Sequence, residues 1–259
     1  MNGIKKAVIL VVLVACATGI GISAYMLASY YNDGKKAEET FNTIRPFDNN
    51  DEEKLKEPYD SELAEKYRKL YEENNDFAAW IRIPETDVDY PVMQNIDDME
   101  YYLKRDFYKN ESSAGTLFLS EFTDIVKPSD VIIVYGHMMN NGSMFGSLKG
   151  YLKKDYYDKH KYIQLDTLSQ RFNYKIVSVI ITQVGTKRKS EFKYYNYSDF
   201  ENENAFNGFV SGYKELEEYE TGETVEYGEK FILLSTCNYT YKNARLVIIA
   251  KQVDELGDN

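Results

Sequence analysis

An uncharged, apolar segment near the N-terminus constrains the fold of this chain more than any other feature. No charged residue lies between Ala7 and Asn32, and Ala7–Ser29 consists mostly of Val, Ile, Leu, Ala and Gly. As a helix, at about 1.5 Å per residue, the segment spans roughly 30 Å, which is the thickness of the hydrocarbon core of a bilayer. We therefore predict a transmembrane signal-anchor helix over residues 7–31.

Two lysines, Lys5 and Lys6, immediately precede this segment. The positive-inside rule then predicts a cytoplasmic tail at residues 1–6 and places everything beyond the helix outside the cell. A cleaved signal peptide is the alternative, although its apolar region is usually only about 7–15 residues long. Small residues at Ser23–Ala24 and Ala28–Ser29 would offer cleavage sites. Both interpretations export the remainder of the chain.

The exported part is strongly acidic, which limits its partners. The formal net charge is −11, and because Lys5 and Lys6 are the only charged residues before Asp33, the remainder carries −13. Such a domain is repelled by nucleic acid, so we expect no nucleic-acid partner. The sequence has no zinc-type Cys/His spacing, Walker loop or GxGxxG motif, so we expect no metal and no cofactor.

Beyond the apolar segment, composition divides the chain in two. Residues 32–60 are polar and charged, and we expect an extracellular stalk that acts as a solvated linker. Residues 61–259 are expected to form one domain that opens with a helix over Ser61–Asn74, capped by Ser61. Its apolar stripe comprises Leu63, Tyr67, Leu70 and Tyr71,.

From Phe77 onward the pattern changes to short β-like runs separated by Pro, Gly, Asn and Asp. Two helices, over about Ser143–Tyr157 and Asp199–Leu216, are expected to interrupt the series. Eight short strands in one domain favour a closed β-barrel or a β-sandwich. The predicted strands are Ala79–Ile83, Val88–Met93, Gly115–Leu119, Val131–Tyr135, Tyr162–Leu165, Phe172–Gln183, Lys230–Thr236 and Arg245–Val253.

Cys237 is the first candidate for chemistry. The other cysteine, Cys16, lies in the apolar segment, so a membrane-spanning helix would leave Cys237 as the lone thiol of the exported part,. The apolar strand Phe231–Leu234 leads directly to it, and a strand end can hold a nucleophilic thiol rigid yet exposed. Position alone fits equally well with a buried structural cysteine.

His137 and Arg245 also lie at predicted strand ends. A Cys–His pair would supply a nucleophile and a general acid/base, and the second histidine, His160, lies in a charged stretch and is expected on the surface. If 238–244 is a hairpin loop, Arg245 returns beside Cys237, where its guanidinium could bind an oxyanion. Taken singly, each residue also fits a structural role.

Together these residues resemble the sortases, most closely class B. The family signature is a Thr-Leu-x-Thr-Cys strand followed by an Arg, with a His on a separate strand. Here Leu233 replaces the first Thr, and we expect its side chain to face away from the thiol. The resemblance covers about residues 60–253, including Asp89–Gln94, Tyr102-Leu103, Arg105–Phe107, Gly115–Phe118, Met144-Phe145 and the helix-bearing insertion around Asp199–Leu216.

The resemblance implies a mainly-β fold: an eight-stranded β-barrel with N-terminal helices and a helix-bearing insertion. It also implies a single-pass protein of the cell membrane with its catalytic domain outside. Such an enzyme is a cysteine transpeptidase that cleaves a C-terminal sorting signal, NPQTN-like or LPXTG-like, after Thr in secreted proteins. The acyl group then passes through a Cys thioester to an amine of peptidoglycan or of its lipid-linked precursor.

The resemblance also assigns site residues. Cys237 becomes the nucleophile, His137 the general acid/base and Arg245 the group that stabilises the oxyanion. The expected substrate-binding residues are Ser235, Thr236, Tyr195 and Asn196. Two alternatives stay open: a cysteine hydrolase in which water resolves the thioester, and an anchored wall-binding β-domain without catalysis.

Overall fold

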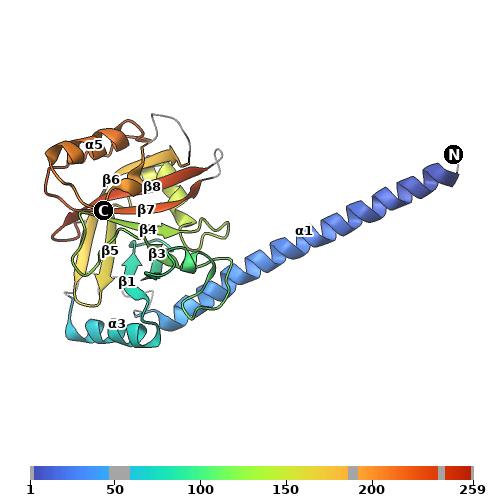
Figure 1. The fold of residues 1–259 in the computed structure, drawn as a ribbon, viewed down its shortest axis with the longest axis horizontal. Coiled ribbons are helices and arrows are strands. Elements are labelled where there is room, and N and C mark those ends of the chain that lie inside the picture. Colours follow the sequence, from blue (N-terminus) through green and yellow to red (C-terminus); the bar gives the residue numbers. More distant parts are fainter. Residues whose placement is uncertain (1–2, 47–58, 186–191, 239–242, 258–259) are drawn as a thin grey trace.

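The fold is a closed barrel of eight strands from which one long helix projects (Figure 1). The computed structural model describes residues 3–46, 59–185, 192–238 and 243–257. The strands are β1 (Phe77–Arg82), β2 (Asp89–Met93), β3 (Leu117–Leu119), β4 (Val131–Gly136), β5 (Tyr162–Thr167), β6 (Arg171–Gln183), β7 (Phe231–Asn238) and β8 (Ala244–Val253). All eight predicted strands are therefore confirmed.

The barrel follows the order β1-β2-β3-β4-β7-β8-β6-β5 and closes where β1 pairs with β5. The pairs β2–β3 and β4–β7 are parallel, and the other pairs are antiparallel. Closure decides between the two predicted architectures in favour of the barrel. The β4–β7 pairing joins strands that lie far apart in the sequence and so brings their ends to one site.

The strands β4, β7 and β8 are apolar on both faces, because both faces are covered. One face points into the barrel, where Ile132, Leu234 and Ile248 join the main core. The opposite face carries Leu233 and Val247 and packs under α5 (Glu203–Lys214). The sequences of these strands are therefore continuous apolar runs without alternating polar residues, as is typical of strands buried on both faces.

The remaining helices are α1 (Gly3–Ile44), α3 (Ser61–Glu73), α4 (Lys154–Tyr157) and the short 3₁₀ helices η1 (Tyr101–Lys104), η2 (Ser147–Leu152) and η3 (Tyr194–Asn196). The predicted helix over Asp199–Leu216 is confirmed as α5. The helix expected over 143–157 is wrong, because the chain there forms η2 and α4. Met144 has a φ of 55° and Gly142 a φ of 93°, and left-handed residues do not continue a helix,.

Helix α3 confirms the predicted stripe with two corrections. Its cap is Asp60 rather than Ser61, because the Asp60 carboxylate accepts a hydrogen bond from the Leu63 N–H at 2.8 Å. Leu63, Tyr67 and Leu70 are buried, but Tyr71 is 42% exposed.

Helix α1 is longer than expected and has two parts. Its side chains at 5–29 are exposed, and the helix is long and apolar enough to cross a membrane. Beyond them, Ala37, Phe41 and Ile44 are buried in the main core of the barrel domain. The prediction of a solvated stalk is therefore wrong for residues 32–46, and most of the rest, 47–58, lies outside the described residues.

Candidate active site

Strand register brings the three predicted catalytic residues together. In the parallel pair β4–β7, Gly136 lies opposite Thr236, so His137 and Cys237 follow at the same level. In the antiparallel pair β7–β8, Cys237 lies opposite Arg245. The hairpin expected between Asn238 and Arg245 thus returns the arginine beside the cysteine, as predicted.

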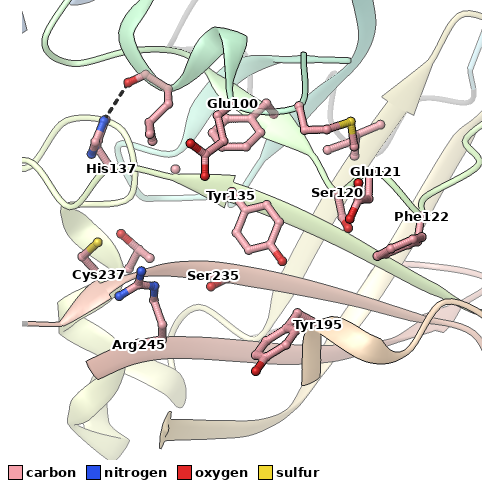
Figure 2. Close-up of a pocket in the computed structure, with 16 residues that line it drawn as sticks. Glu100, Ser120, Glu121, Phe122, Tyr135, His137, Tyr195, Ser235, Cys237 and Arg245 are labelled. Carbon is pink, nitrogen blue, oxygen red and sulfur yellow. Dashed lines mark hydrogen bonds between the residues drawn. The ribbon is translucent and has the colours of Figure 1, made fainter. Parts of the chain in front are cut away.

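These residues line one end of a pocket of about 460 Å³ (Figure 2). Tyr195 and Phe122 lie at the other end, and Tyr135 and Ser235 lie between. The full lining is Met99, Glu100, Leu103, Phe118, Leu119, Ser120, Glu121, Phe122, Tyr135, Gly136, His137, Tyr195, Ser235, Thr236, Cys237 and Arg245. The Cys237, His137 and Arg245 side chains gather at one end, while Glu100 and Glu121 lie farther along the pocket (Figure 2). This arrangement suits a peptide whose reacting carbonyl lies at the cysteine end.

The ring of His137 is held by a backbone carbonyl. Its Nε2 lies 2.7 Å from the Leu103 oxygen, shown as the dashed line in Figure 2. A carbonyl oxygen can only accept, so Nε2 carries the hydrogen in this contact. The neutral ring then has its acceptor at Nδ1, and Nδ1 is the atom through which His137 can exchange a proton.

Comparison with known proteins decides the family. A model of the sortase domain matches residues 81–253, well over half of the chain. The chain belongs to the sortase family. Sortase B of Listeria monocytogenes is 30% identical over 199 residues, which are 74% of this chain and 76% of that protein. Sortase B of Staphylococcus aureus is 27% identical over 199 residues, 76% of this chain and 78% of that protein.

Solved structures agree in fold. The crystal structure of sortase B from B. anthracis in complex with AAEK1 is 28% identical, has a TM-score of 0.70, and covers 86% of this chain and 99% of its own. A Staphylococcus aureus sortase B–substrate complex, 23% identical, has a TM-score of 0.71 over 86% of this chain and 98% of its own. The protein is thus a sortase B homologue, a cysteine transpeptidase.

Behind the pocket wall, Tyr194 contacts the pocket-lining Ser235 without being part of the lining itself, and sequence patterns did not indicate it. The hydroxyls of Tyr194 and Ser235 lie 2.7 Å apart in a buried hydrogen bond. Burial raises the pKa of Tyr194, and although the bond to Ser235 and the charge of Arg245 lower it, the net pKa is about 12. Tyr194 is therefore a neutral hydroxyl at physiological pH that orients Ser235.

Leu233 does not face away from the thiol, contrary to expectation. Side chains alternate along a strand, so Leu233, Ser235 and Cys237 share one face of β7. Leu233 is fully buried in the apolar cluster under α5. Its replacement of Thr is explained by this packing, because an apolar side chain suits that cluster.

The other predicted substrate-binding residues have different positions. Thr236 is on the opposite face of β7, lines the pocket, and its buried Oγ1 meets no hydrogen-bond partner among the described residues. Tyr195 is half-buried in the pocket wall. Asn196 is exposed and is not part of the lining.

The second histidine is a structural residue, and its expected surface position is wrong. His160 is only 8% exposed, and its Nδ1 lies 2.8 Å from the Tyr156 carbonyl. Its ring packs on that of Tyr156 with centroids 4.1 Å apart. The surface prediction rested on the flanking Lys159 and Lys161, but only the histidine between them is buried.

Proposed function

We propose that this sortase cleaves a C-terminal sorting signal after Thr and transfers the acyl group from Cys237 to a cell-wall amine. The observation that carries the proposal is the strand register, which places Cys237 opposite Arg245 and level with His137 in one pocket. No other thiol of the chain lies in a comparable setting, because Cys16 is in the exposed apolar part of α1.

The first half-reaction forms a thioester. The Cys237 thiolate attacks the Thr carbonyl carbon, and the oxygen gains the negative charge, which the Arg245 guanidinium stabilises. The carbon–nitrogen bond then breaks as protonated His137 gives its Nδ1 proton to the leaving amine. The Leu103 carbonyl keeps Nε2–H in place, so the ring presents Nδ1 throughout.

The second half-reaction reverses these roles. The incoming amine attacks the thioester carbon, neutral His137 accepts a proton from it, and the Cys237 thiolate leaves. The new amide conserves the acyl bond without ATP, because the thioester stores its energy.

Substrate binding is proposed for Ser235, Thr236, Tyr195 and Asn196. Support is strongest for Thr236, because a buried hydroxyl without a partner costs free energy that a substrate group could recover,. Ser235 is oriented by Tyr194, and Tyr195 offers an amphipathic wall,. Asn196 lies outside the lining and would contact only a longer segment of the substrate.

The proposed partners are secreted proteins with NPQTN-like or LPXTG-like signals, and peptidoglycan or its lipid-linked precursor as the amine. The apolar part of α1 is proposed as a single-pass anchor, with residues 1–6 in the cytoplasm and the barrel outside the cell. This location would hold the enzyme where secreted proteins and lipid-linked wall precursors both emerge.

The experiment is product analysis with the full-length protein in detergent micelles. Peptides bearing the two kinds of signal are incubated with lysine, diaminopimelate or oligoglycine amines, and the products are resolved by mass spectrometry. Transfer predicts a peptide–amine product that ends at Thr and increases with amine concentration. Cleavage to the free acid alone, at every amine concentration, would contradict transfer and favour the hydrolase.

A further inference from the structure

The loop that follows His137 is closed at its base beside the histidine. The Phe145 N–H donates to the His137 carbonyl at 2.9 Å, and Met138 and Met144 form a bridge. The Phe145 ring packs so closely on the preceding Gly136 that an added Cβ there would lie 2.7 Å from the ring. This loop, residues 138–146, therefore sets the backbone from which the His137 ring projects.

The tip of this loop is covered by α1, directly after the apolar part of the helix. The Tyr30 hydroxyl lies 3.0 Å from the Met139 sulfur. Gly34 faces Asn141 so closely that an added Cβ would lie 2.8 Å from its Nδ2. The same Asn141 amide accepts bonds from the N–H and hydroxyl of Ser143, at 3.2 and 2.8 Å. A shift of Asn141 would therefore disturb the turn that leads back to Phe145.

The same helix also reaches the segment that holds the other side of the His137 ring. The Ser113 hydroxyl donates to the Asp33 carboxylate at 3.0 Å. Around Ser113, the N–H groups of Ser112 and Thr116 bond to the carbonyls of Lys104 and Tyr102, at 3.0 and 2.9 Å. These two carbonyls flank Leu103, whose own carbonyl accepts the His137 Nε2–H.

The last turns of α1 and Arg45, the residue after it, also pack against the barrel. The Phe41 ring is buried and packs edge-to-face on Tyr90 at 5.4 Å. The Arg45 guanidinium lies 2.7 Å from the Asp89 carboxylate in a largely buried ion pair. Residues 30–45, here named the docking segment, are therefore held against the barrel by buried contacts.

We propose that the docking segment positions His137, with Gly34 and Tyr30 as the positioning residues, so that the membrane anchor is a structural part of the active site. This inference rests on the proposed role of His137. Proton transfer needs the ring in a near-attack geometry, and a displacement of about 1 Å can cost on the order of a hundredfold in rate. The helix touches both elements that fix the ring.

The test compares Gly34→Val with Gly21→Val in full-length protein held in detergent micelles. Gly21 lies in the same helix, and an added Cβ there meets nothing within 4 Å. Turnover of a signal peptide with an amine is measured together with the thermal midpoint. We expect kcat of Gly34→Val to fall about tenfold with the peptide KM within about twofold, since only His137 is displaced. The control should match the wild type.

A second variant guards against misfolding of Gly34→Val. Tyr30→Phe removes only the hydroxyl at Met139 and is expected to lower kcat about threefold, again without a change in KM. Equal kcat values for the wild type and both variants would overturn the inference while leaving the proposed function intact. Absence of turnover in the wild type and in Gly21→Val would overturn the proposed function and this inference with it.

Discussion

The three side chains proposed for catalysis each lie at the end of an apolar strand, and that position explains why they could be found. Strand residues packed on both faces hold the backbone rigid, while the next residue emerges into the pocket. Cys237 and His137 follow such runs, and Arg245 begins one. The pairing of these ends then depends on register, which the sequence predicted only for the β7–β8 hairpin.

Arg245→Lys tests the proposed role of the guanidinium. Lysine keeps the charge but loses the planar fork, so we expect kcat to fall by about ten- to a hundredfold with little change in the peptide KM. Steady-state transfer kinetics measure both constants. Lys251→Arg, a charge-conserving change farther along β8, is the matched control. Near-normal kcat in Arg245→Lys would remove this residue from the mechanism.

Residue patterns could not reveal Tyr194 or the orientation of Leu233. Tyr194 meets Ser235 only because η3 lies against β7, a contact between residues 41 positions apart. The orientation of the Leu233 side chain could be predicted only if both faces of β7 were known to be covered. On a strand with one covered face, an apolar residue is expected to point into the barrel. The burial of His160 was not predicted for a similar reason, because its charged neighbours in sequence indicated a surface position.

At the scale of elements, α1 differs most from expectation. Residues 32–46 resemble a stalk in sequence because most of them are polar or charged. Yet Ala37, Phe41 and Ile44 recur at helical spacing and form the buried face,. This apolar stripe was visible in the sequence, but it comprises only three residues. A stripe of three residues in a polar segment predicts a docked helix only when the surface it meets is known.

Phe41→Ala tests whether this docking stabilises the domain. Removing a fully buried aromatic ring leaves a cavity beside Tyr90, and we expect the free energy of unfolding to fall by about 3–5 kcal/mol,. Chemical denaturation of the full-length protein in micelles measures it. Glu39→Ala, an exposed position on the same helix, should change stability by less than about 0.5 kcal/mol,. Equal stability of the two variants would show that the helix is not docked.

Docking should also depend on pH through Glu38. Burial raises the pKa of this carboxyl above its ordinary 4.5, against the bond from Tyr90 and the charge of Arg45. Between the ordinary and the raised pKa the unfolded chain binds fewer protons than the folded one, so stability falls as pH rises through that window. In Glu38→Gln this decrease in stability with rising pH should be absent. Thermal midpoints of the variant and the wild type, measured from pH 4 to 8, would show the difference. Glu39→Gln, which removes the same charge from an exposed position, should retain it.

At the scale of the whole molecule, the barrel and the C-terminal part of α1 share one core. The eight strands were predictable because their apolar or alternating runs are separated by turn residues,. Closure of the barrel was not predictable, because the β1–β5 pairing joins residues 82 to 88 positions apart, and local patterns carry no information on such pairs,. The choice between barrel and sandwich therefore needed the structure.

The fate of the N-terminal segment can be tested directly. An uncleaved anchor predicts that the protein resists alkaline carbonate extraction from membranes and that its intact mass includes residues 1–29. External protease should digest the barrel domain but leave a short membrane-protected fragment. An N-terminus at about residue 24 or 29, with the protein in the soluble fraction, would instead indicate a cleaved signal peptide.

The most direct test of catalysis by Cys237 is intact-mass analysis of the full-length protein mixed with a signal peptide in the absence of amine. We predict a thioester adduct that maps to Cys237, is absent in Cys237→Ala, and disappears as peptide–amine product forms when amine is added. Turnover that survives in Cys237→Ala would contradict this mechanism, because it would place the nucleophile elsewhere.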